Sequence, residues 1–452
     1  MFFTLENLIY ATLSIIFAPG FLLYLLVILM AAFGKSSGIT KLYTKIMILI
    51  FEWGKHRIEI HNKALENNNK SSNNDQGNDD QVCDDENQDV APAYRHPKIE
   101  FRRSIEDLHG AFTLADIMYF CRSGIKVIVD DEVTQRFDAA ELPSWNLLTR
   151  TNNHYEFISW RLSILWGLGC ILRLGILFPF RLILALISLT CFFVGTALIG
   201  RIQDEKSRRK YYCWLSLAIF RMMSRSFSSV ITYHNRENRA KGGGICVANH
   251  TSPIDIIILG CDNCYAMVGQ IQGGLFGSVQ NAMSKAEHQV WFQRTEMKDR
   301  LSVTKRLKDH VEDKSLLPIL IFPEGTCINN TSIMMFKKGS FEVGGTIYPV
   351  AIKYDSRFAD PFWNSSKETL TRHLLNILTS WALVADVWYL PPQTQQPGET
   401  AIEFTNRVKS LIAKQGGLVD LDWDGQLKRE KPKPALMKKK QEEYSRRLLN
   451  ME

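Results

Sequence analysis

The first apolar stretch of the chain is long enough to cross a membrane. Residues 8–33, "LIYATLSIIFAPGFLLYLLVILMAAF", contain no charged side chain. A helix needs roughly 20 such residues to cross a hydrocarbon core of about 30 Å. A cleaved signal peptide has a shorter apolar core and a basic leader, whereas the only charged residue before this run is Glu6. The pattern therefore predicts a membrane-spanning or deeply inserted helix over residues 1–34.

A second apolar block covers residues 157–200 and is interrupted by Pro179 and by arginines, among them Arg173 and Arg181. Because proline breaks helices, two helices joined near Pro179 are expected. Arginines are costly in hydrocarbon unless their head groups reach a polar environment. A membrane hairpin that enters the bilayer and returns therefore fits as well as two full spans.

Basic residues indicate which side of the membrane holds the rest of the chain. Lys35, Lys41 and Lys45 follow the first apolar run, and "RIQDEKSRRK", residues 201–210, follows the second. Positive charges flank spans on the cytosolic side. N-glycosylation sequons begin at Asn249, Asn329 and Asn364. A cytosolic location leaves these sequons unglycosylated, so we expect the bulk of the chain in the cytosol.

After residue 201 the hydrophobic pattern alternates between two periods. Short apolar runs such as "GICVANH", "AMVGQ" and "IYPVAIKY" read as buried strands, and "DRLSVTKRLKDHVED" and "AIEFTNRVKSLIAKQ" read as helices. This alternation predicts an α/β domain with a mixed, largely buried sheet flanked by helices. The chain then divides into a membrane helix (1–34), a juxtamembrane segment (35–65), a disordered acidic linker (66–92), a mixed cytosolic segment of unassigned role (93–156), a membrane hairpin (157–200), an α/β domain (201–427) and a basic tail (428–452).

Charge and cysteine content bear on the expected partners, disulfides and metal ions. The net charge of +7 is concentrated in segments such as the tail, which is typical of a solvated stretch or one near an anionic membrane leaflet. We expect membrane lipids and no nucleic acid as partners. Nine cysteines, an odd number, do not indicate a disulfide framework. "CDNC", residues 261–264, has zinc-ligand spacing but no matching second pair, so no metal is expected.

The stretch "VANHTSPIDIII" carries the strongest candidate chemistry. Ser252 suits a helix N-cap and Pro253 the first helical position, which places Asp255 in the first turn and His250 just outside it. Asp255 can then bond one ring nitrogen of His250 and make the other more basic. Such a pair deprotonates a hydroxyl. The alternative is a carboxylate that only favours the helix dipole beside a structural histidine.

Three further blocks follow in order: "VWFQRTE", "LIFPEGT" and "IYPVAIKY". With "NHTSPID" they resemble the four motifs of the glycerophospholipid acyltransferase family. Longer stretches, including "FPEGTCINNTSIMMFKKGSFEVGGTIYPVAIKYD" and "GGLVDLDWDGQLKR", resemble the endoplasmic-reticulum glycerol-3-phosphate acyltransferases. The resemblance covers residues 221–426. "WFQRTE" departs from the family where Gln293 replaces an acidic residue and Thr295 a serine, which puts acceptor preference in question.

The resemblance implies a role for each matching residue. His250 corresponds to the catalytic base and Asp255 to its partner. The substrate-binding positions are Arg294, Glu324, Gly325, Thr326, Pro349 and Lys337. Arg294 suits a phosphate, and Gly325 permits close backbone approach. We interpret Glu324 as an acceptor for a glycerol hydroxyl or as a partner of Arg294. Lys337 adds positive charge for the acceptor phosphate or for the phosphates of coenzyme A, and the alternative is that it belongs to a plain solvated loop.

The implied reaction is acyl transfer from acyl-CoA to the sn-1 hydroxyl of glycerol 3-phosphate, giving lysophosphatidic acid. A thioester is already activated, so acyl-CoA is a co-substrate and no cofactor is expected. The implied location is the endoplasmic-reticulum membrane with a cytosolic catalytic domain, and lipid droplets are a second location. Acylation of a lysophospholipid and a non-catalytic lipid-binding role stay open as alternatives. The oligomeric state is not readable.

Overall fold

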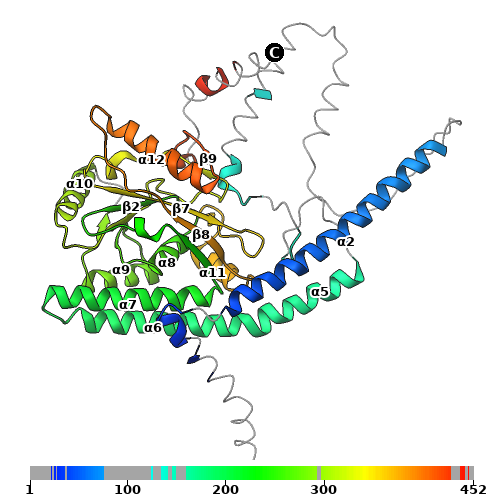
Figure 1. Cartoon of the computed structure of the whole chain (residues 1–452), viewed down its shortest axis with the longest axis horizontal. Helices are drawn as coiled ribbons and strands as arrows, with labels where there is room; N and C mark the ends of the chain where they lie inside the picture. The colour runs from blue at the N-terminus through cyan, green and yellow to red at the C-terminus, as the bar shows by residue number, and fades with distance from the viewer. Residues whose placement is uncertain are drawn as a thin grey trace, which may run out of the picture. The chain divides into compact units, whose positions relative to one another are not determined.

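The computed structural model describes residues 22, 25, 26, 28–35, 38–75, 124–125, 134–140, 145–148, 159–292, 297–428, 438–442 and 446. The chain forms two compact units, residues 1–57 with 134–430, and residues 58–133 with 431–452. The described part of the second unit consists of the C-terminal portion of α2 (Ile39–Asp75) and a few separate residues. The first unit contains an α/β sandwich (Figure 1).

A seven-stranded mixed sheet forms the centre of the first unit, with the strand order β1-β8-β7-β2-β5-β3-β4. The strands are β1 Val230–His234, β2 Ile245–Ala248, β3 Ala266–Gln270, β4 Val290–Phe292, β5 Ile319–Ile321, β7 Ile347–Tyr354 and β8 Val384–Tyr389. β7 and β8 are antiparallel, and every other neighbouring pair is parallel. The predicted mixed, largely buried sheet is confirmed. A small second sheet pairs β6 (Ser332–Ile333) with β9 (Val419–Asp420).

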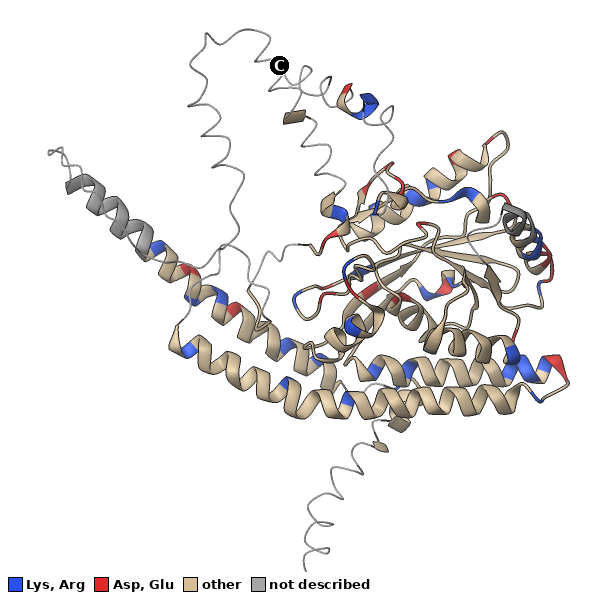
Figure 2. Cartoon of the chain, turned by 180° about the vertical axis from the view of Figure 1, so that it is seen from behind, with Lys and Arg blue, Asp and Glu red and all other residues tan. Residues whose placement is uncertain are grey.

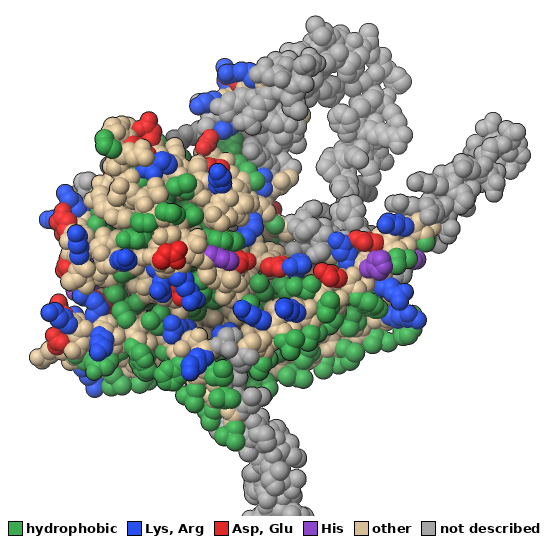
Figure 3. All heavy atoms as spheres, in the orientation of Figure 1, with side chains coloured by type: hydrophobic (Ala, Val, Ile, Leu, Met, Phe, Trp, Pro, Cys, Tyr) green, Lys and Arg blue, Asp and Glu red, His purple; other side chains and the backbone are tan. Residues whose placement is uncertain are grey.

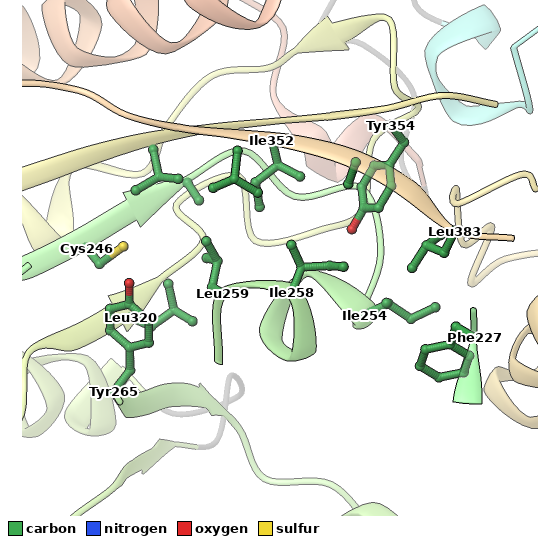
Figure 4. Close-up of a cluster of buried hydrophobic side chains, with 14 of the residues drawn as sticks. Phe227, Cys246, Ile254, Ile258, Leu259, Tyr265, Leu320, Ile352, Tyr354 and Leu383 are labelled. Atoms are coloured by element: carbon green, nitrogen blue, oxygen red, sulfur yellow. The ribbon is translucent and has the colours of Figure 1, made fainter. Parts of the chain in front are cut away.

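Both faces of the sheet are buried. Neighbouring residues of each strand point to opposite faces, and each face has its own core cluster. In β2, Cys246 and Ala248 join one core cluster, whereas Ile245 and Val247 join another. The first cluster includes apolar side chains of α8, as Figure 4 shows for Ile254, Ile258 and Leu259. Continuous apolar strands such as "ICVA" are therefore explained by helices on both faces.

Helices cover both faces of the sheet. Residues of α6, α7, α8, α9 and α11 pack into the first cluster, and residues of α10 and α12 into the second. Their bounds are α7 Glu205–Ser226, α8 Ile254–Gly260, α9 Gly274–Ala286, α10 Met297–Glu312, α11 Leu370–Leu378 and α12 Ala401–Gly416; short helical turns are η1 Gln135–Phe137, η3 Arg236–Asn238, η4 Lys338–Ser340 and η5 Gly425–Lys428. α12 begins with a capping box of Thr400 and Glu403 and ends at Gly417 in the left-handed conformation, as the local sequence requires.

The predicted membrane hairpin is wrong. α5 (Trp160–Cys170), the π-helical η2 (Ile171–Leu177) and α6 (Phe178–Ile199) form one continuous helix (Figure 1). Pro179 does not break it, because proline lies in the first turn of α6, directly after the wider π-helical stretch. That stretch makes room for a ring that clashes with an ordinary helical carbonyl. By length and composition this is the one described helix that could cross a membrane.

Two arginines of this helix, Arg173 and Arg181, face the α/β domain. The Arg181 guanidinium is buried and donates to the Leu378 carbonyl at 2.9 Å, to the Ser380 and Trp381 carbonyls, and to the Ser228 hydroxyl. Arg173 donates to the Thr379 carbonyl. The cost of burying these cations is thus offset by charge-assisted hydrogen bonds, and the two side chains tie the helix to the end of α11.

The segments around the domain are only partly described. α2 continues through Asp75, into the stretch that we expected to begin the linker at residue 66, and residues 76–92 lie outside the described residues. So do most of the expected first membrane helix and of the basic tail. From the mixed segment, η1 packs on the domain, because the Asn329 and Asn364 amides donate to carbonyls of residues 135–138.

Candidate active site

The candidate site lies where several parallel strands end. β2 ends at Ala248, and the next two residues are Asn249 and His250. Carboxyl ends of parallel strands meet at one edge of a sheet, where ligands bind in open α/β folds. The Asn249 amide continues the strand pairing, since it donates to the Ile352 carbonyl at 2.9 Å and accepts from the Ile352 N–H at 2.8 Å. His250 therefore starts from a fixed backbone position.

The predicted contact between His250 and Asp255 is present. His250 Nδ1 lies 2.9 Å from Asp255 Oδ2, which also accepts from the N–H groups of Thr251 and Ser252 at 2.8 and 2.9 Å. α8 begins at Ile254, one residue later than the sequence indicates, and Pro253 flanks it. Asp255 is fully buried, whereas the His250 side chain keeps 16% of its surface exposed. The imidazole can thus meet a ligand while the carboxylate cannot.

Local charges favour the protonated form of His250. Burial lowers the pKa of His250, but the Cys327 sulfur and the Asp255 carboxylate outweigh burial and raise this pKa to about 10. The ring also stacks on Phe322, with centroids 4.3 Å apart. A histidine with a raised pKa is a strong base once deprotonated.

Turnover that needs a neutral His250 should accordingly rise with pH between 7 and 10, because the neutral fraction of His250 grows as the pH approaches its pKa of about 10. The measurement is the pH–rate profile of acyl transfer.

Glu324 holds the backbone of this turn. The residue is 2% exposed, and its carboxyl group accepts from the N–H of His250 at 2.7 Å and from the N–H of Met334 at 2.8 Å. Burial raises the pKa of Glu324 to about 8, against the opposing effect of these amide bonds. The His250 carbonyl in turn accepts from Ile328 N–H at 2.8 Å. Glu324 therefore has a structural task beside His250, and its predicted contact with a glycerol hydroxyl stays a prediction.

The other predicted substrate-binding residues are placed unevenly. Gly325 has φ of 67°, a conformation that favours glycine, and Thr326 touches the segment at Gly425, where a Cβ would lie 2.6 Å from the Thr326 methyl group. The Lys337 ammonium is paired with Asp424. Pro349 is buried inside β7 opposite Val247, which indicates packing. Their roles toward a substrate stay predictions.

Arg294, the predicted phosphate ligand, lies outside the described residues, as do Gln293 and Thr295. Its strand, β4, ends at Phe292 and runs parallel to β3. The chain therefore enters this segment from the same sheet edge that carries His250.

Sequence patterns did not reveal three polar residues near the site. The Tyr354 hydroxyl donates to Asp255 Oδ1. The Asn330 amide bonds both backbone groups of Tyr354, at 2.7 and 3.0 Å. His373 on α11 is buried, its Nε2 lies 3.0 Å from the Ser252 hydroxyl, and burial lowers its pKa to about 4. Tyr354 and Asn330 stand inside the motif blocks, but their contacts span long stretches of chain.

Two of the three sequons are built into this site. Asn249 and Asn329 are buried, and their amides bond backbone groups of Ile352 and of residues 135–138. A glycan on either nitrogen would remove these bonds. The folded domain is therefore incompatible with glycosylation at both positions.

Metal-ligand clusters are not found among the residues that the structure describes, where no group of three or more His, Cys, Asp or Glu is arranged to hold an ion. The cysteines of "CDNC", Cys261 and Cys264, are buried free thiols.

A buried carboxylate that bonds a partly exposed imidazole at the edge of a mixed sheet is compatible with a histidine base, and comparison with known proteins gives the class of the domain. The Acyltransferase family model matches residues 230–353. The chain is 52% identical to glycerol-3-phosphate acyltransferase 3 of Danio rerio, over 94% of this chain and 93% of that protein. It is 51% identical to glycerol-3-phosphate acyltransferase 4 of Mus musculus, over 98% and 95%. The chain belongs to the glycerol-3-phosphate acyltransferase 3/4 family.

A solved structure shows a more distant likeness. The 1-acyl-sn-glycerophosphate acyltransferase of Thermotoga maritima matches 56% of this chain and 100% of its own, with 17% sequence identity and a TM-score of 0.38.

Proposed function

We propose that this chain transfers a long-chain acyl group from acyl-CoA to the sn-1 hydroxyl of glycerol 3-phosphate. The observation that carries the proposal is the His250–Asp255 contact at the carboxyl edge of the sheet, in a family whose named relatives acylate glycerol 3-phosphate. Lysophosphatidic acid and free coenzyme A are the products. This is the first acylation in glycerolipid and triacylglycerol synthesis.

The reaction needs one base and no covalent enzyme intermediate. Neutral His250 takes the proton of the hydroxyl through its second ring nitrogen, and the hydroxyl oxygen attacks the thioester carbonyl. The tetrahedral intermediate then expels the thiolate of coenzyme A, which takes the proton back from His250. Asp255 holds the ring and stabilises the transient imidazolium. A thioester is already an activated acyl donor, so the proposal includes no metal and no cofactor.

The intact dyad also bears on the non-catalytic alternative. Moving a carboxylate out of water costs free energy. A lipid-binding protein without catalytic activity has no need to place such a fully buried carboxylate against His250 Nδ1. Such an arrangement is common where a histidine must act as a base.

An acceptor competition tests the proposal. Membranes containing this chain receive a labelled long-chain acyl-CoA with glycerol 3-phosphate or lysophosphatidic acid, and His250→Ala serves as the blank. We expect labelled lysophosphatidic acid from the first acceptor and none from the blank. Phosphatidic acid formed from the lysolipid alone would assign the chain to the second acylation, and no product from either acceptor would favour the non-catalytic role.

For location, we propose that the continuous α5–η2–α6 helix lies in the plane of the endoplasmic-reticulum membrane, with the domain in the cytosol; lipid droplets offer the same surface. Figure 3 shows hydrophobic side chains gathered along the lower edge of the view, over α5, η2 and α6. Figure 2 shows few charged residues on these helices. Exposed apolar residues occur along the whole helix, at Ile164, Ile176, Leu186 and Leu198, while Arg173 and Arg181 face the domain.

Helix depth distinguishes an in-plane helix from a spanning one. A helix of 40 residues is about 60 Å long, twice the hydrocarbon thickness, so a spanning helix would place its middle deep and its ends outside. Cysteines introduced one at a time at 164, 176, 186 and 198 would carry a fluorophore in phosphatidylcholine vesicles with spin-labelled lipids. The background replaces by serine the native cysteines at positions 83, 121, 170, 191 and 213, and keeps the buried thiols.

We expect all four probes at similar shallow depth, and no quenching at the control position Ile402, which is exposed on α12. Deep quenching of the middle probes with unquenched ends would show that the helix spans the bilayer.

A further inference from the structure

Tyr354 reaches the catalytic dyad from a different strand. It is the last residue of β7 and is buried, and Figure 4 shows its hydroxyl pointing from β7 toward α8. There the hydroxyl donates a hydrogen bond to Asp255 Oδ1. Burial and the nearby Asp255 carboxylate raise the pKa of Tyr354 well above its ordinary value, so the phenol stays a donor across the pH range of the enzyme.

The two oxygens of Asp255 have unequal surroundings. Oδ2 is shared by His250 Nδ1 and by the N–H groups of Thr251 and Ser252. Among the described residues, Tyr354 is the one donor to Oδ1. Since Asp255 is fully buried, water does not replace a lost donor there. The Tyr354 hydroxyl therefore fixes the plane of the carboxylate and keeps Oδ2 aligned with His250.

Tyr354 is itself held firmly. Its N–H donates to Asn330 Oδ1 at 3.0 Å, and its carbonyl accepts from Asn330 Nδ2 at 2.7 Å. On the other side, Tyr354 pairs with Ala385 of β8. Asn330 also accepts at its carbonyl from the Lys353 ammonium at 2.7 Å. The phenol thus comes from a backbone that is fixed on both edges, which is what a positioning group requires.

We propose that Tyr354 is a positioning residue of the acyl transfer reaction, which acts on His250 through Asp255 and sets the proton affinity of the dyad. This inference rests on the proposed function for its kinetic consequence, but the contact itself does not. The chain of contacts runs from Tyr354 through Asp255 to His250, so a donor on β7 controls a base on the β2–α8 turn.

The direction of the effect follows from electrostatics. When His250 gives up its proton, a buried negative charge is left on Asp255 without its cationic neighbour. The Tyr354 hydroxyl stabilises that state by donating to the carboxylate. Without the hydroxyl, the dyad holds its proton more tightly and the pKa of His250 rises. A smaller fraction of the enzyme then has a neutral base at any pH below that pKa.

Other titratable groups face the dyad and must be the same in every comparison. They are Glu324 and Cys327 from the loop after β5, and His373 from α11. Tyr233 on β1 also lies near Tyr354, and its hydroxyl is the one that the control variant removes. None of them is changed by a substitution at Tyr354. Differences between variants at one pH therefore report on the Tyr354 hydroxyl.

The test compares Tyr354→Phe with Tyr233→Phe. Tyr233 is a matched control because its hydroxyl donates to the Ile258 carbonyl at the other end of α8, at 2.6 Å. Both variants lose one shielded hydroxyl and keep the ring. For Tyr354→Phe we expect kcat at pH 7 to fall by about tenfold and the pH–rate profile to move by about one unit to higher pH, with KM unchanged. For Tyr233→Phe we expect wild-type kinetics.

A second readout does not depend on acyl transfer. Diethylpyrocarbonate modifies neutral imidazoles, so its rate of reaction at His250, followed by mass spectrometry, titrates with the pKa of His250. Tyr354→Phe should shift this titration upward by the same amount as the rate profile. In an Asp255→Asn background the shift should disappear, because Tyr354 then has no charge to stabilise.

Each outcome decides whether Tyr354 positions the dyad. An unchanged His250 titration in folded Tyr354→Phe overturns the proposal. A higher KM without a shift assigns Tyr354 to substrate contact instead, and equal losses in Tyr233→Phe assign the effect to stability. If the wild-type chain acylates neither acceptor, the proposed function fails while the His250 titration still tests Tyr354.

Discussion

Replacing His250 by alanine is expected to lower kcat by about a thousandfold, because no other described group is placed to take the proton of the acceptor hydroxyl. Asp255→Asn should cost a similar factor. Asparagine has nearly the shape of aspartate and can keep the bonds from Thr251 and Ser252, but it lacks the charge that stabilises the imidazolium. The measurement is single-acceptor turnover at saturating acyl-CoA with membranes of equal protein content.

The chain offers a matched control for this pair. His234, the last residue of β1, has its Nε2 3.0 Å from Asp386 Oδ1 of β8, and both side chains are partly exposed. His234→Ala removes an equivalent contact outside the site and should leave turnover unchanged. Turnover at the wild-type rate in His250→Ala or Asp255→Asn would refute the catalytic assignment, whereas loss of all three activities would indicate a general folding defect. Membrane localisation should be unchanged in each variant.

Glu324→Ala is expected to lower both stability and activity. It leaves the N–H groups of His250 and Met334 without their acceptor and opens a cavity, which together cost about 3 kcal/mol of unfolding free energy. For a domain of this size that corresponds to a fall in melting temperature of about 6–12 °C. Turnover should fall as well, because the backbone of His250 loses its fixed position.

Comparison with two other variants separates this role from substrate binding. Glu324→Gln keeps an acceptor for one of the two N–H groups and should lose less stability than alanine. Glu342→Ala removes an exposed carboxylate paired with Lys338 and should change the melting temperature little. If Glu324 instead binds a glycerol hydroxyl, Glu324→Gln would raise KM for glycerol 3-phosphate without changing the melting temperature.

Local sequence signals predicted the centre of the site well. The β2–turn–α8 unit and the His250–Asp255 contact depend on residues within one short stretch, where cap and turn preferences act directly. α12 was likewise predicted from its periodicity, whereas its capping box was seen only in the structure. The alternation of periods after residue 201 also predicted the α/β class and the mixed sheet.

Long-range contacts explain what the sequence could not show. Pro179 looks like a helix breaker, and only the neighbouring π-helical turn makes it compatible with a continuous helix. Arg181 looks costly in an apolar block, but its partners come from residues near 380. The Tyr354 hydroxyl reaches Asp255 through the register of β7, and Asn330 holds the Tyr354 backbone; no local pattern encodes these contacts. The part of the site around Arg294 lies outside the described residues.

Two asparagines, Asn249 and Asn330, fix the loops of the site to the sheet before a substrate binds. Asn249 and Asn330 each exchange two hydrogen bonds with the backbone of β7, at Ile352 and Tyr354. The loops that carry His250 and Glu324 therefore extend the hydrogen-bond pattern of the sheet. Their conformational entropy is lost when the domain folds, before any substrate arrives. In the proposed reaction, the contacts made by the arriving acyl-CoA and its acceptor then serve to align the hydroxyl with the thioester.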